Sequence, residues 1–319
     1  MNIAVVTSGG DAPGMNPCLA QIVKNAAEKG HRVFGYRRGF LGVRDNDYVE
    51  LQVKDVSSWY KLGGTVLKTG RMSELKETVW QRKLIKQLEK NSIEAFLVLG
   101  GDGSFRGALA LHNINSALNI VGIPSTIDNN IYGSDYTLGF DTAINKQMAY
   151  IDDISDTGIS LPGRIFFVET LGAWDSYLTN SSVLMGMADF AVLADRPMTD
   201  EEILARIKTL LAAGNNDYIL VTFAEGTPEN SIHRMLAAAD YVSKALNIKV
   251  KCNVLGYQQR GGVPTALERL HAAGFAKYAV LAADKKIMNK YVAYRKGEYA
   301  YVDLANACKK KNFSAYESL

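Results

Sequence analysis

Three short loops of this chain combine glycine, acidic and hydroxyl residues directly after apolar runs. They are TSGGDAPGMN at residues 7–16, GGDGS at residues 100–104 and PSTIDNN at residues 124–130. Glycine lets the backbone approach an anion closely, a helix start offers it free N–H groups, and Asp102 could hold a hard cation such as Mg²⁺. Asp128 could accept the proton of a substrate hydroxyl during phosphoryl transfer. These residue types are typical of a phosphoryl-transfer site.

Each loop also has a purely structural interpretation. A tight turn can require glycine for its geometry alone, and an aspartate in a turn often caps its own backbone. Short glycine motifs therefore carry a real false-positive risk. Three such loops after successive strands favour the functional interpretation, because a parallel sheet brings the carboxyl ends of its strands side by side.

The elements that would position these loops are short apolar runs alternating with amphipathic helical patterns. This alternation predicts an α/β fold with mostly parallel sheets. No change of composition marks a flexible linker, so we expect two α/β domains, with a boundary near Phe140 where a long helical pattern begins. The expected strands are residues 3–6, 33–36, 95–99, 120–123, 165–168, 190–193, 218–223 and 250–255.

Composition narrows the class of protein further. Of 319 residues, 47% are hydrophobic and 22% are charged, and the net charge is only +3, which gives no support for a nucleic-acid partner. The widely spaced Cys18, Cys252 and Cys308 do not match a zinc site or a disulfide framework. No apolar run approaches the ~18 residues of a membrane span, and the N-terminus does not resemble a signal peptide. We expect a cytoplasmic protein without a membrane partner.

Four segments together resemble the signature segments of bacterial ATP-dependent 6-phosphofructokinases, in the same order and spacing. They are SGGDAPGMN (8–16), GGDGS (100–104), TIDN (126–129) and VLGYQQRGG (254–262). The resemblance covers nearly the whole chain. It implies two Rossmann-like three-layer domains: a larger ATP-binding domain of residues 1–140 plus about 255–300, and a smaller sugar-phosphate-binding domain of residues 141–254 plus about 301–319.

The resemblance also implies an activity and an assembly. The activity is ATP-dependent phosphorylation of fructose 6-phosphate at its 1-hydroxyl in glycolysis, with Mg²⁺. The assembly is a homotetramer whose active sites are shared between subunits. In pyrophosphate-using relatives, an acidic residue replaces Gly103 and a lysine replaces Ser125; neither is present here, so ATP is the expected phosphoryl donor.

Individual roles follow from the same resemblance. Asp128 would be the base, Thr126 and Arg71 would complete the catalytic group, and Asp102 would hold Mg²⁺. The residues implied to contact ATP are Gly10, Arg71, Gly101, Gly103 and Ser104. The residues implied to contact the sugar phosphate are Arg164, Leu171, Gly172, Glu225, Lys251, Tyr257 and Arg260.

Four positions near the implied site depart from the family pattern. Asn130 stands where the family has a second aspartate, and Ala173 stands where it has an arginine. Lys251 replaces an arginine and keeps the charge but not the planar fork, while Tyr257 replaces a histidine and brings no positive charge. We therefore expect a working but kinetically altered enzyme.

The implied effector site departs further. Ala20, Ser155, Asn215 and Asn216 lie at or near positions where the bacterial enzymes carry cations, and Lys24 is left as the main positive charge. An anionic effector such as ADP or phosphoenolpyruvate should therefore bind weakly.

Other functions stay open. One is a catalytically impaired paralogue that binds sugar phosphate or nucleotide as a regulatory subunit. Another is a related sugar-phosphate kinase, acting for instance on tagatose 6-phosphate. NAD and lipid kinases also contain GGDG, but they would not explain VLGYQQRGG.

Overall fold

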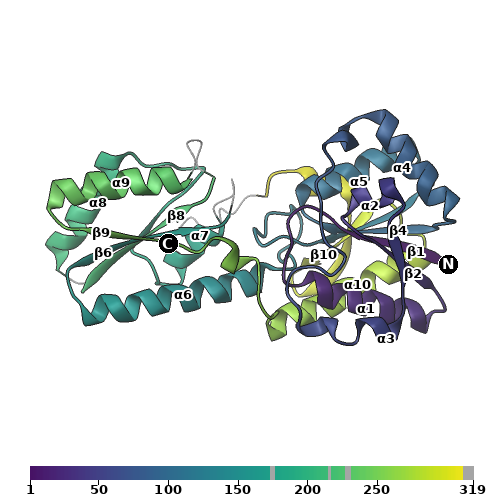
Figure 1. The fold of residues 1–319 in the computed structure, drawn as a ribbon, viewed down its shortest axis with the longest axis horizontal. Helices are drawn as coiled ribbons and strands as arrows, with labels where there is room; N and C mark the ends of the chain where they lie inside the picture. Colours follow the sequence, from purple (N-terminus) through teal and green to yellow (C-terminus); the bar gives the residue numbers. More distant parts are fainter. Residues whose placement is uncertain (173–176, 215–216, 227–230, 312–319) are drawn as a thin grey trace. The chain divides into compact units, whose positions relative to one another are not determined.

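The computed structural model describes residues 1–172, 177–214, 217–226 and 231–311, which form two compact units (Figure 1). Unit 1 consists of Met1–Thr142 and the described residues from Arg260 onward, and unit 2 is the described part of Ala143–Gln259. Residues 301–311, which we expected in the smaller domain, lie in unit 1, because Glu298–Asp303 pairs with a strand of its sheet.

Unit 1 is built on a seven-stranded sheet with the strand order β11-β10-β5-β4-β1-β2-β3. Strands β3 and β11, at the two edges, run antiparallel to their neighbours, and the other pairings are parallel. The strands are β1 (Asn2–Thr7), β2 (Arg32–Tyr36), β3 (Tyr48–Leu51), β4 (Ala95–Gly100), β5 (Asn119–Pro124), β10 (Lys290–Arg295) and β11 (Glu298–Asp303).

Helices cover both faces of this sheet (Figure 1). Side chains alternate along β1, so that Ile3 and Val5 pack toward α1 and α10 while Ala4 and Val6 pack toward α4 and α5. The helices are α1 (Met15–Glu28), α2 (Phe40–Asp45), α3 (Val53–Val56), α4 (Thr78–Lys90), α5 (Asp102–Ile114) and α10 (Ala266–Asp284), with short 3₁₀ turns η1 (Trp59–Lys61), η2 (Ser73–Lys76) and η4 (Leu304–Cys308).

Unit 2 has a four-stranded, wholly parallel sheet with the order β7-β8-β6-β9. One face packs on α8 and α9, and the other packs on α6 and α7. The elements are α6 (Phe140–Ser160), β6 (Arg164–Thr170), α7 (Tyr177–Leu184), β7 (Phe190–Val192), α8 (Asp200–Ala213), β8 (Tyr218–Ala224), α9 (Ser231–Leu246), β9 (Val250–Val254) and η3 (Gly256–Gln259).

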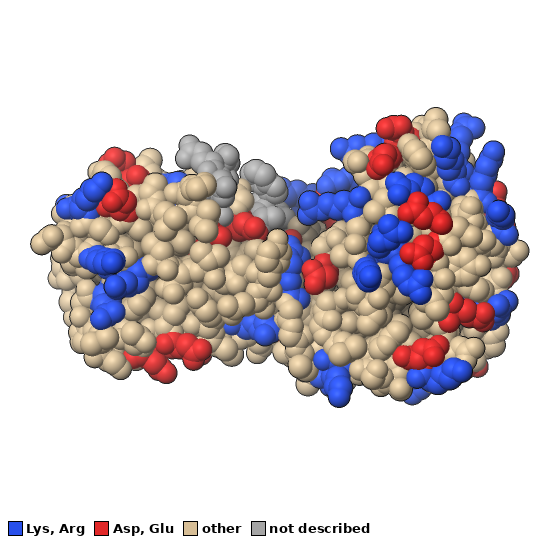
Figure 2. Space-filling model, viewed as in Figure 1, with Lys and Arg blue, Asp and Glu red and all other residues tan. Residues whose placement is uncertain are grey.

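The predicted fold class is confirmed: both units are three-layer α/β structures with mostly parallel sheets. All eight expected strands form, and β3, β10 and β11 were not expected from the sequence. No described helix is long and apolar enough to cross a membrane. On the visible face, Lys and Arg lie interspersed with Asp and Glu (Figure 2).

A buried carboxylate ties the first turn of α10 to the start of α6. Glu268 is fully buried and accepts hydrogen bonds from the N–H of Gly139 at 2.7 Å, the N–H of Thr142 at 3.2 Å and the hydroxyl of Thr142 at 3.1 Å. Burial disfavours the charged form and raises the pKa of Glu268 to about 7, although these hydrogen bonds act in the opposite direction. Its protonation state therefore changes near neutral pH.

This raised pKa predicts a pH-dependent contribution to stability. Between the ordinary value of 4.5 and about 7, the folded state binds more protons at Glu268 than the unfolded state. The free energy of unfolding that this group contributes therefore falls as pH rises through that window. Glutamine does not titrate, so Glu268→Gln should lower the Tm, and the Tm gap to the wild type should narrow between pH 5 and pH 8 by a few degrees, corresponding to about 1–3 kcal/mol.

Differential scanning calorimetry across that pH range measures the gap. Glu298 carries an exposed carboxylate on β11, and Glu298→Gln serves as the matched control, with no change in its gap to the wild type expected. A gap for Glu268→Gln that stays constant or widens with pH would contradict the assignment.

Candidate active site

The three loops singled out from the sequence lie next to one another at the carboxyl ends of neighbouring strands. Strand β4 lies between β1 and β5 and is parallel to both. The N–H of Ser8 donates to Leu99 O at 2.9 Å, and the N–H of Ser125 donates to Gly100 O at 2.9 Å. These bonds bring the loops after Thr7, Gly100 and Pro124 to one edge of the unit 1 sheet.

The glycines of these loops differ in whether the backbone conformation or packing requires them. Gly9 has a φ of +89°, a conformation that favours glycine, and a Cβ at Gly100 would lie 2.7 Å from Ser8 O. These two positions are explained by the backbone alone. A Cβ on Gly103 would meet no atom within 4 Å, so neither its packing nor a positive φ requires glycine there. The open space at Gly103 is available to a ligand.

The glycine contacts also show which side chains converge. A Cβ added to Gly10 would lie 2.7 Å from Arg260 Nη1. A Cβ added to Gly101 would lie 3.5 Å from Thr126 Cβ. Arg260 Nη1 also donates to Asp11 O at 3.3 Å. The structure therefore gathers five of the implied site residues from three loops and the start of the last segment of unit 1: Gly10, Gly101, Ser104, Thr126 and Arg260.

Helix α5 begins directly behind this edge of the sheet. The first residue of α5 is Asp102, and Gly101 precedes it. The carbonyl of Gly101 accepts hydrogen bonds from the N–H groups of Ser104 and Phe105. The Asp102 carboxylate forms an ion pair with Arg106 one turn later. This helix N-terminus, next to the open space at Gly103, suits an anion such as a phosphate.

Asp102 could hold a magnesium ion only together with oxygens from elsewhere. Within the described ranges of the chain, no group of three or more His, Cys, Asp and Glu side chains could hold a metal ion by itself. Mg²⁺ is commonly bound by one or two carboxylates together with substrate phosphates and water, so one carboxylate at an anion-binding helix start fits it.

The Asp128 loop is held by hydrogen bonds on both sides. The Thr126 hydroxyl donates to Asp128 Oδ2 at 3.2 Å, and the Thr137 hydroxyl donates to Thr126 O at 2.6 Å. The buried Asn129 has a φ of 50° and donates from Nδ2 to Asp135 O at 3.1 Å. These hydrogen bonds fix the loop to the segment that follows it, and they hold the turn that carries Asp128.

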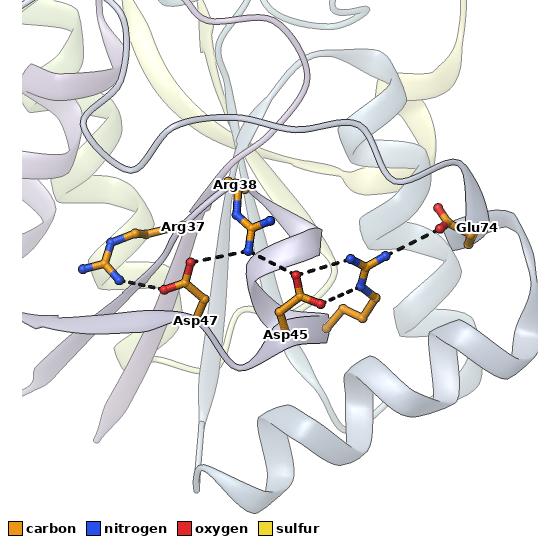
Figure 3. Close-up of polar contacts among 6 residues, drawn as sticks. Arg37, Arg38, Asp45, Asp47 and Glu74 are labelled. Atoms are coloured by element: carbon orange, nitrogen blue, oxygen red, sulfur yellow. Dashed lines mark hydrogen bonds and ion pairs between the residues drawn. The ribbon is translucent and has the colours of Figure 1, made fainter.

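A chain of ion pairs supports the segment that carries Arg71 (Figure 3). Arg37 pairs with Asp47 at 2.7 Å, and Arg38 pairs with both Asp47 at 3.5 Å and Asp45 at 3.1 Å. The series continues through Arg44, which lies 2.8 Å from Asp45 and 3.5 Å from Glu74 in η2. The hydrogen bond from Arg44 holds the pKa of Asp45 below its usual value. Sequence analysis missed this support, because the pairing depends on the fold.

Arg71 itself is exposed, and its segment is tied to the first glycine loop. The Thr69 hydroxyl donates to Gly9 O at 2.5 Å, and the Thr7 hydroxyl donates to Lys68 O at 2.9 Å. These bonds place the backbone of residues 68–69 beside the glycine loop, two residues before Arg71.

The implied sugar-phosphate residues of unit 2 divide into two groups. Leu171 and Gly172 follow β6, Glu225 follows β8, and Tyr257 lies in η3 after β9, all near the carboxyl ends of the strands. The Glu225 N–H donates to Thr170 O at 2.9 Å, and the Leu171 N–H donates to the Gln259 side chain at 2.7 Å. These four residues share one end of the sheet.

Arg164 and Lys251 lie toward the other end. Arg164 is the first residue of β6. Lys251 on β9 pairs with Phe166, which lies two residues after Arg164 on β6. The seven residues of β6 span about 20 Å, so Arg164 is far from Leu171 within this unit. Arg164, Lys249 and Lys251 line an open groove of about 630 Å³ together with Tyr150, Asp153 and Asn253. The resemblance assigned all these residues to one sugar phosphate, although the predicted strands already placed Arg164 before a strand and Glu225 after one.

Three of the positions that the sequence linked to regulation lie on described helices. Ala20 is fully buried on α1, Lys24 is exposed on the same helix, and the Ser155 hydroxyl donates to Ile151 O within α6. The positions expected from the sequence at Ala173, Asn215 and Asn216 lie outside the described residues.

Relatives of known classification match almost the whole chain. The phosphofructokinase family model matches residues 2–283. The chain is 36% identical over 304 residues to the ATP-dependent 6-phosphofructokinase of Sulfurihydrogenibium sp. (strain YO3AOP1), covering 93% of this chain and 90% of that protein. It is 39% identical over 280 residues to the ATP-dependent 6-phosphofructokinase of Lactobacillus acidophilus, covering 87% and 84%.

Solved structures agree with this match. The phosphofructokinase of Saccharomyces cerevisiae superposes with a TM-score of 0.86 at 26% identity, over 96% of this chain and 45% of that chain. The chain thus spans a little under half of the yeast subunit. A pyrophosphate-dependent phosphofructokinase from Marinobacter aquaeolei has a TM-score of 0.84 at 18% identity, which shows the shared fold alone. With three signature segments meeting at one edge of the unit 1 sheet, Arg260 of the fourth lying beside Gly10, and a family match from residue 2 to residue 283, the chain belongs to the phosphofructokinase family.

Proposed function

We propose that this chain is an ATP-dependent 6-phosphofructokinase, which transfers the γ-phosphoryl group of ATP to the 1-hydroxyl of fructose 6-phosphate in glycolysis, in the cytoplasm. The observation that carries the proposal is the meeting of the glycine loops and the Asp128 loop at the carboxyl ends of β1, β4 and β5. The curated relatives, at 36% and 39% identity over most of the chain, support ATP as the phosphoryl donor.

In this proposal the nucleotide lies against the start of α5. The backbone at Gly10, Gly101 and Gly103 and the Ser104 side chain line the phosphates, and the open space at Gly103 admits them. Arg71 reaches the transferred phosphoryl group from its braced segment. Asp102, on leaving Arg106, would hold Mg²⁺ together with the ATP phosphates, and the ion would supply positive charge to offset that of the transferred phosphoryl group.

Asp128 acts as the base in this site. Its carboxylate accepts the proton of the sugar 1-hydroxyl while that oxygen attacks phosphorus, and Thr126 holds the carboxylate and helps to orient the phosphoryl group. The two bonds of Thr126 and Thr137 keep the base in one orientation, so little reorganisation is needed when substrate binds.

The sugar phosphate is held by residues from two copies of the chain. Leu171, Gly172, Glu225 and Tyr257 lie at one end of the unit 2 sheet, while Arg164 and Lys251 lie at the other, a separation longer than one fructose bisphosphate. We therefore assign the groove at Arg164 and Lys251 to the active site of a second copy, in a homotetramer. Arg260, in unit 1 beside Gly10, binds phosphate in its own subunit.

The departures from the family pattern lead us to propose altered kinetics and weak allostery. Replacing an aspartate by Asn130 removes a charge near the metal and the phosphoryl group, which costs about 1–3 kcal/mol, or about ten- to a hundredfold in rate. The burial of Ala20 and the loss of cations near Lys24 leave little to bind an anionic effector.

A coupled assay with Mg-ATP and fructose 6-phosphate tests the proposal, on the wild type and on Asn130→Asp. We expect turnover by the wild type, a gain in kcat of about tenfold in Asn130→Asp from the restored charge, and no turnover when pyrophosphate replaces ATP. Tagatose 6-phosphate in the same assay tests the related sugar-phosphate kinase.

Absence of turnover in both proteins would defeat the proposal. If both then still bound fructose 6-phosphate or ATP in calorimetry, the regulatory-subunit alternative, which Asn130 favours, would take its place.

A further inference from the structure

Lys311 is a half-buried lysine that has no role in the proposed mechanism. Its Nζ donates a hydrogen bond to the main-chain carbonyl of Asn129 at 2.7 Å. One residue earlier, Lys310 forms an antiparallel backbone bridge with Ile131. The end of the described chain therefore runs alongside the loop that carries Asp128.

The carbonyl that Lys311 contacts belongs to a residue of unusual conformation. Asn129 has a φ of 50°, in the left-handed region that asparagine adopts more readily than most residues with a side chain, and the residue is 3% exposed. A left-handed residue costs of order 1 kcal/mol and persists only where its surroundings hold it. Two contacts hold this one: its own Nδ2 donates to Asp135 O, and its carbonyl accepts from Lys311.

The lysine is also unusual for its position. Lys309 and Lys310 are exposed, as expected for a run of three lysines, whereas the Lys311 side chain turns inward. Burial lowers the pKa of Lys311 to about 8, while the charge of Asp135 acts in the opposite direction. A lysine gives up hydration for such a site only when its ammonium group finds an acceptor inside.

We propose that Lys311 is a positioning residue for phosphoryl transfer, holding the carbonyl of Asn129 so that the loop presents Asp128 to the substrate hydroxyl. The inference rests on the proposed role of Asp128. Lys311 acts through the backbone of the adjacent residue, and its loss should affect the chemical step more than nucleotide binding, because the loops at Gly10 and Gly101 make their own contacts.

Three variants test this inference. Lys311→Met keeps the length of the side chain but removes the donor, Lys311→Arg keeps a charged donor, and Lys310→Met removes a neighbouring exposed lysine while leaving its backbone bridge intact. In Lys311→Met we expect kcat to fall about tenfold, since small misplacement of a catalytic group is costly, with KM for ATP within about twofold of wild type. Lys311→Arg should recover most of kcat, and Lys310→Met should match the wild type.

Two further readouts separate positioning from mere anchoring. Hydrogen–deuterium exchange of residues 126–131 should quicken in Lys311→Met and not in Lys310→Met. The wild-type kcat should also fall as pH rises through about 8, where Lys311 loses its proton, and Lys311→Arg should not show this fall, because arginine stays charged.

The possible outcomes are distinct. Faster exchange with unchanged kcat would mean that Lys311 only anchors the chain, and the inference would be overturned. Unchanged exchange would overturn it as well, even if Lys311→Met were destabilised elsewhere. If the wild type showed no kinase activity, the proposed function would fail, while the exchange experiment would still decide whether Lys311 holds the loop.

Discussion

Asp128→Asn is expected to lower kcat by about a thousandfold, because general-base catalysis contributes about 10²–10⁴-fold and the amide cannot accept the sugar hydroxyl proton. The variant is nearly isosteric, and its amide oxygen can still accept the bond from the Thr126 hydroxyl that the carboxylate accepts at 3.2 Å. The loop should therefore keep its conformation, and KM for ATP should stay close to the wild-type value. The coupled assay measures both quantities.

A matched control is Asp303→Asn, which removes an exposed carboxylate paired with Lys290 on the β10–β11 hairpin of the same unit. It should leave kcat unchanged. If Asp128→Asn kept more than a tenth of the wild-type kcat, Asp128 would not be the base.

The second large effect is expected at Gly103. Gly103→Asp should raise KM for ATP by about a hundredfold, because a carboxylate at the start of α5 would face the phosphates, and juxtaposed like charges cost several kcal/mol. A Cβ at this position meets no atom within 4 Å, and an acidic residue suits a helix N-terminus, so the fold should not suffer.

Gly103→Ala is the control that adds the Cβ without the charge, and its KM for ATP should stay within about threefold of wild type, since it fills little of the space that the phosphates need. Isothermal calorimetry with ATP gives the same comparison without catalysis. Equal ATP affinity in Gly103→Asp and the wild type would show that the nucleotide does not lie against α5.

The sequence predicted the parallel strands well and the antiparallel ones poorly. Seven of the eight predicted strands are mostly buried, and their apolar runs are a signal that can be read without knowledge of the fold. Strands β10 and β11 form a hairpin whose turn contains Lys296 and Gly297, both with positive φ. Alternating residues around a Lys-Gly pair could have indicated it, since such turns need positive φ at both central residues.

The location of a site residue was predictable where its motif lies within a single loop. The clustering of Gly10, Gly101, Thr126 and Asp128 follows from three loops on adjacent parallel strands. The predicted strands already placed Arg164 before residues 165–168 and Glu225 after residues 218–223, but the resemblance assigned both residues to one sugar-phosphate site. Lys311 was not singled out either, since a run of lysines ordinarily indicates a solvated surface.

The order in which the two units can be completed follows from how the chain passes between them. The core on one face of unit 1 is closed by α10 and its sheet is extended by β10, both encoded in the last sixth of the chain. The described part of unit 2 lies within one continuous stretch, Ala143–Gln259. On the ribosome, where domains generally fold as they emerge, this described part of unit 2 can fold before α10 and β10 of unit 1 have been synthesised. Unit 1, although begun first, keeps an incompletely covered apolar sheet face until α10 and β10 have been synthesised, so we expect the nascent chain to bind chaperones.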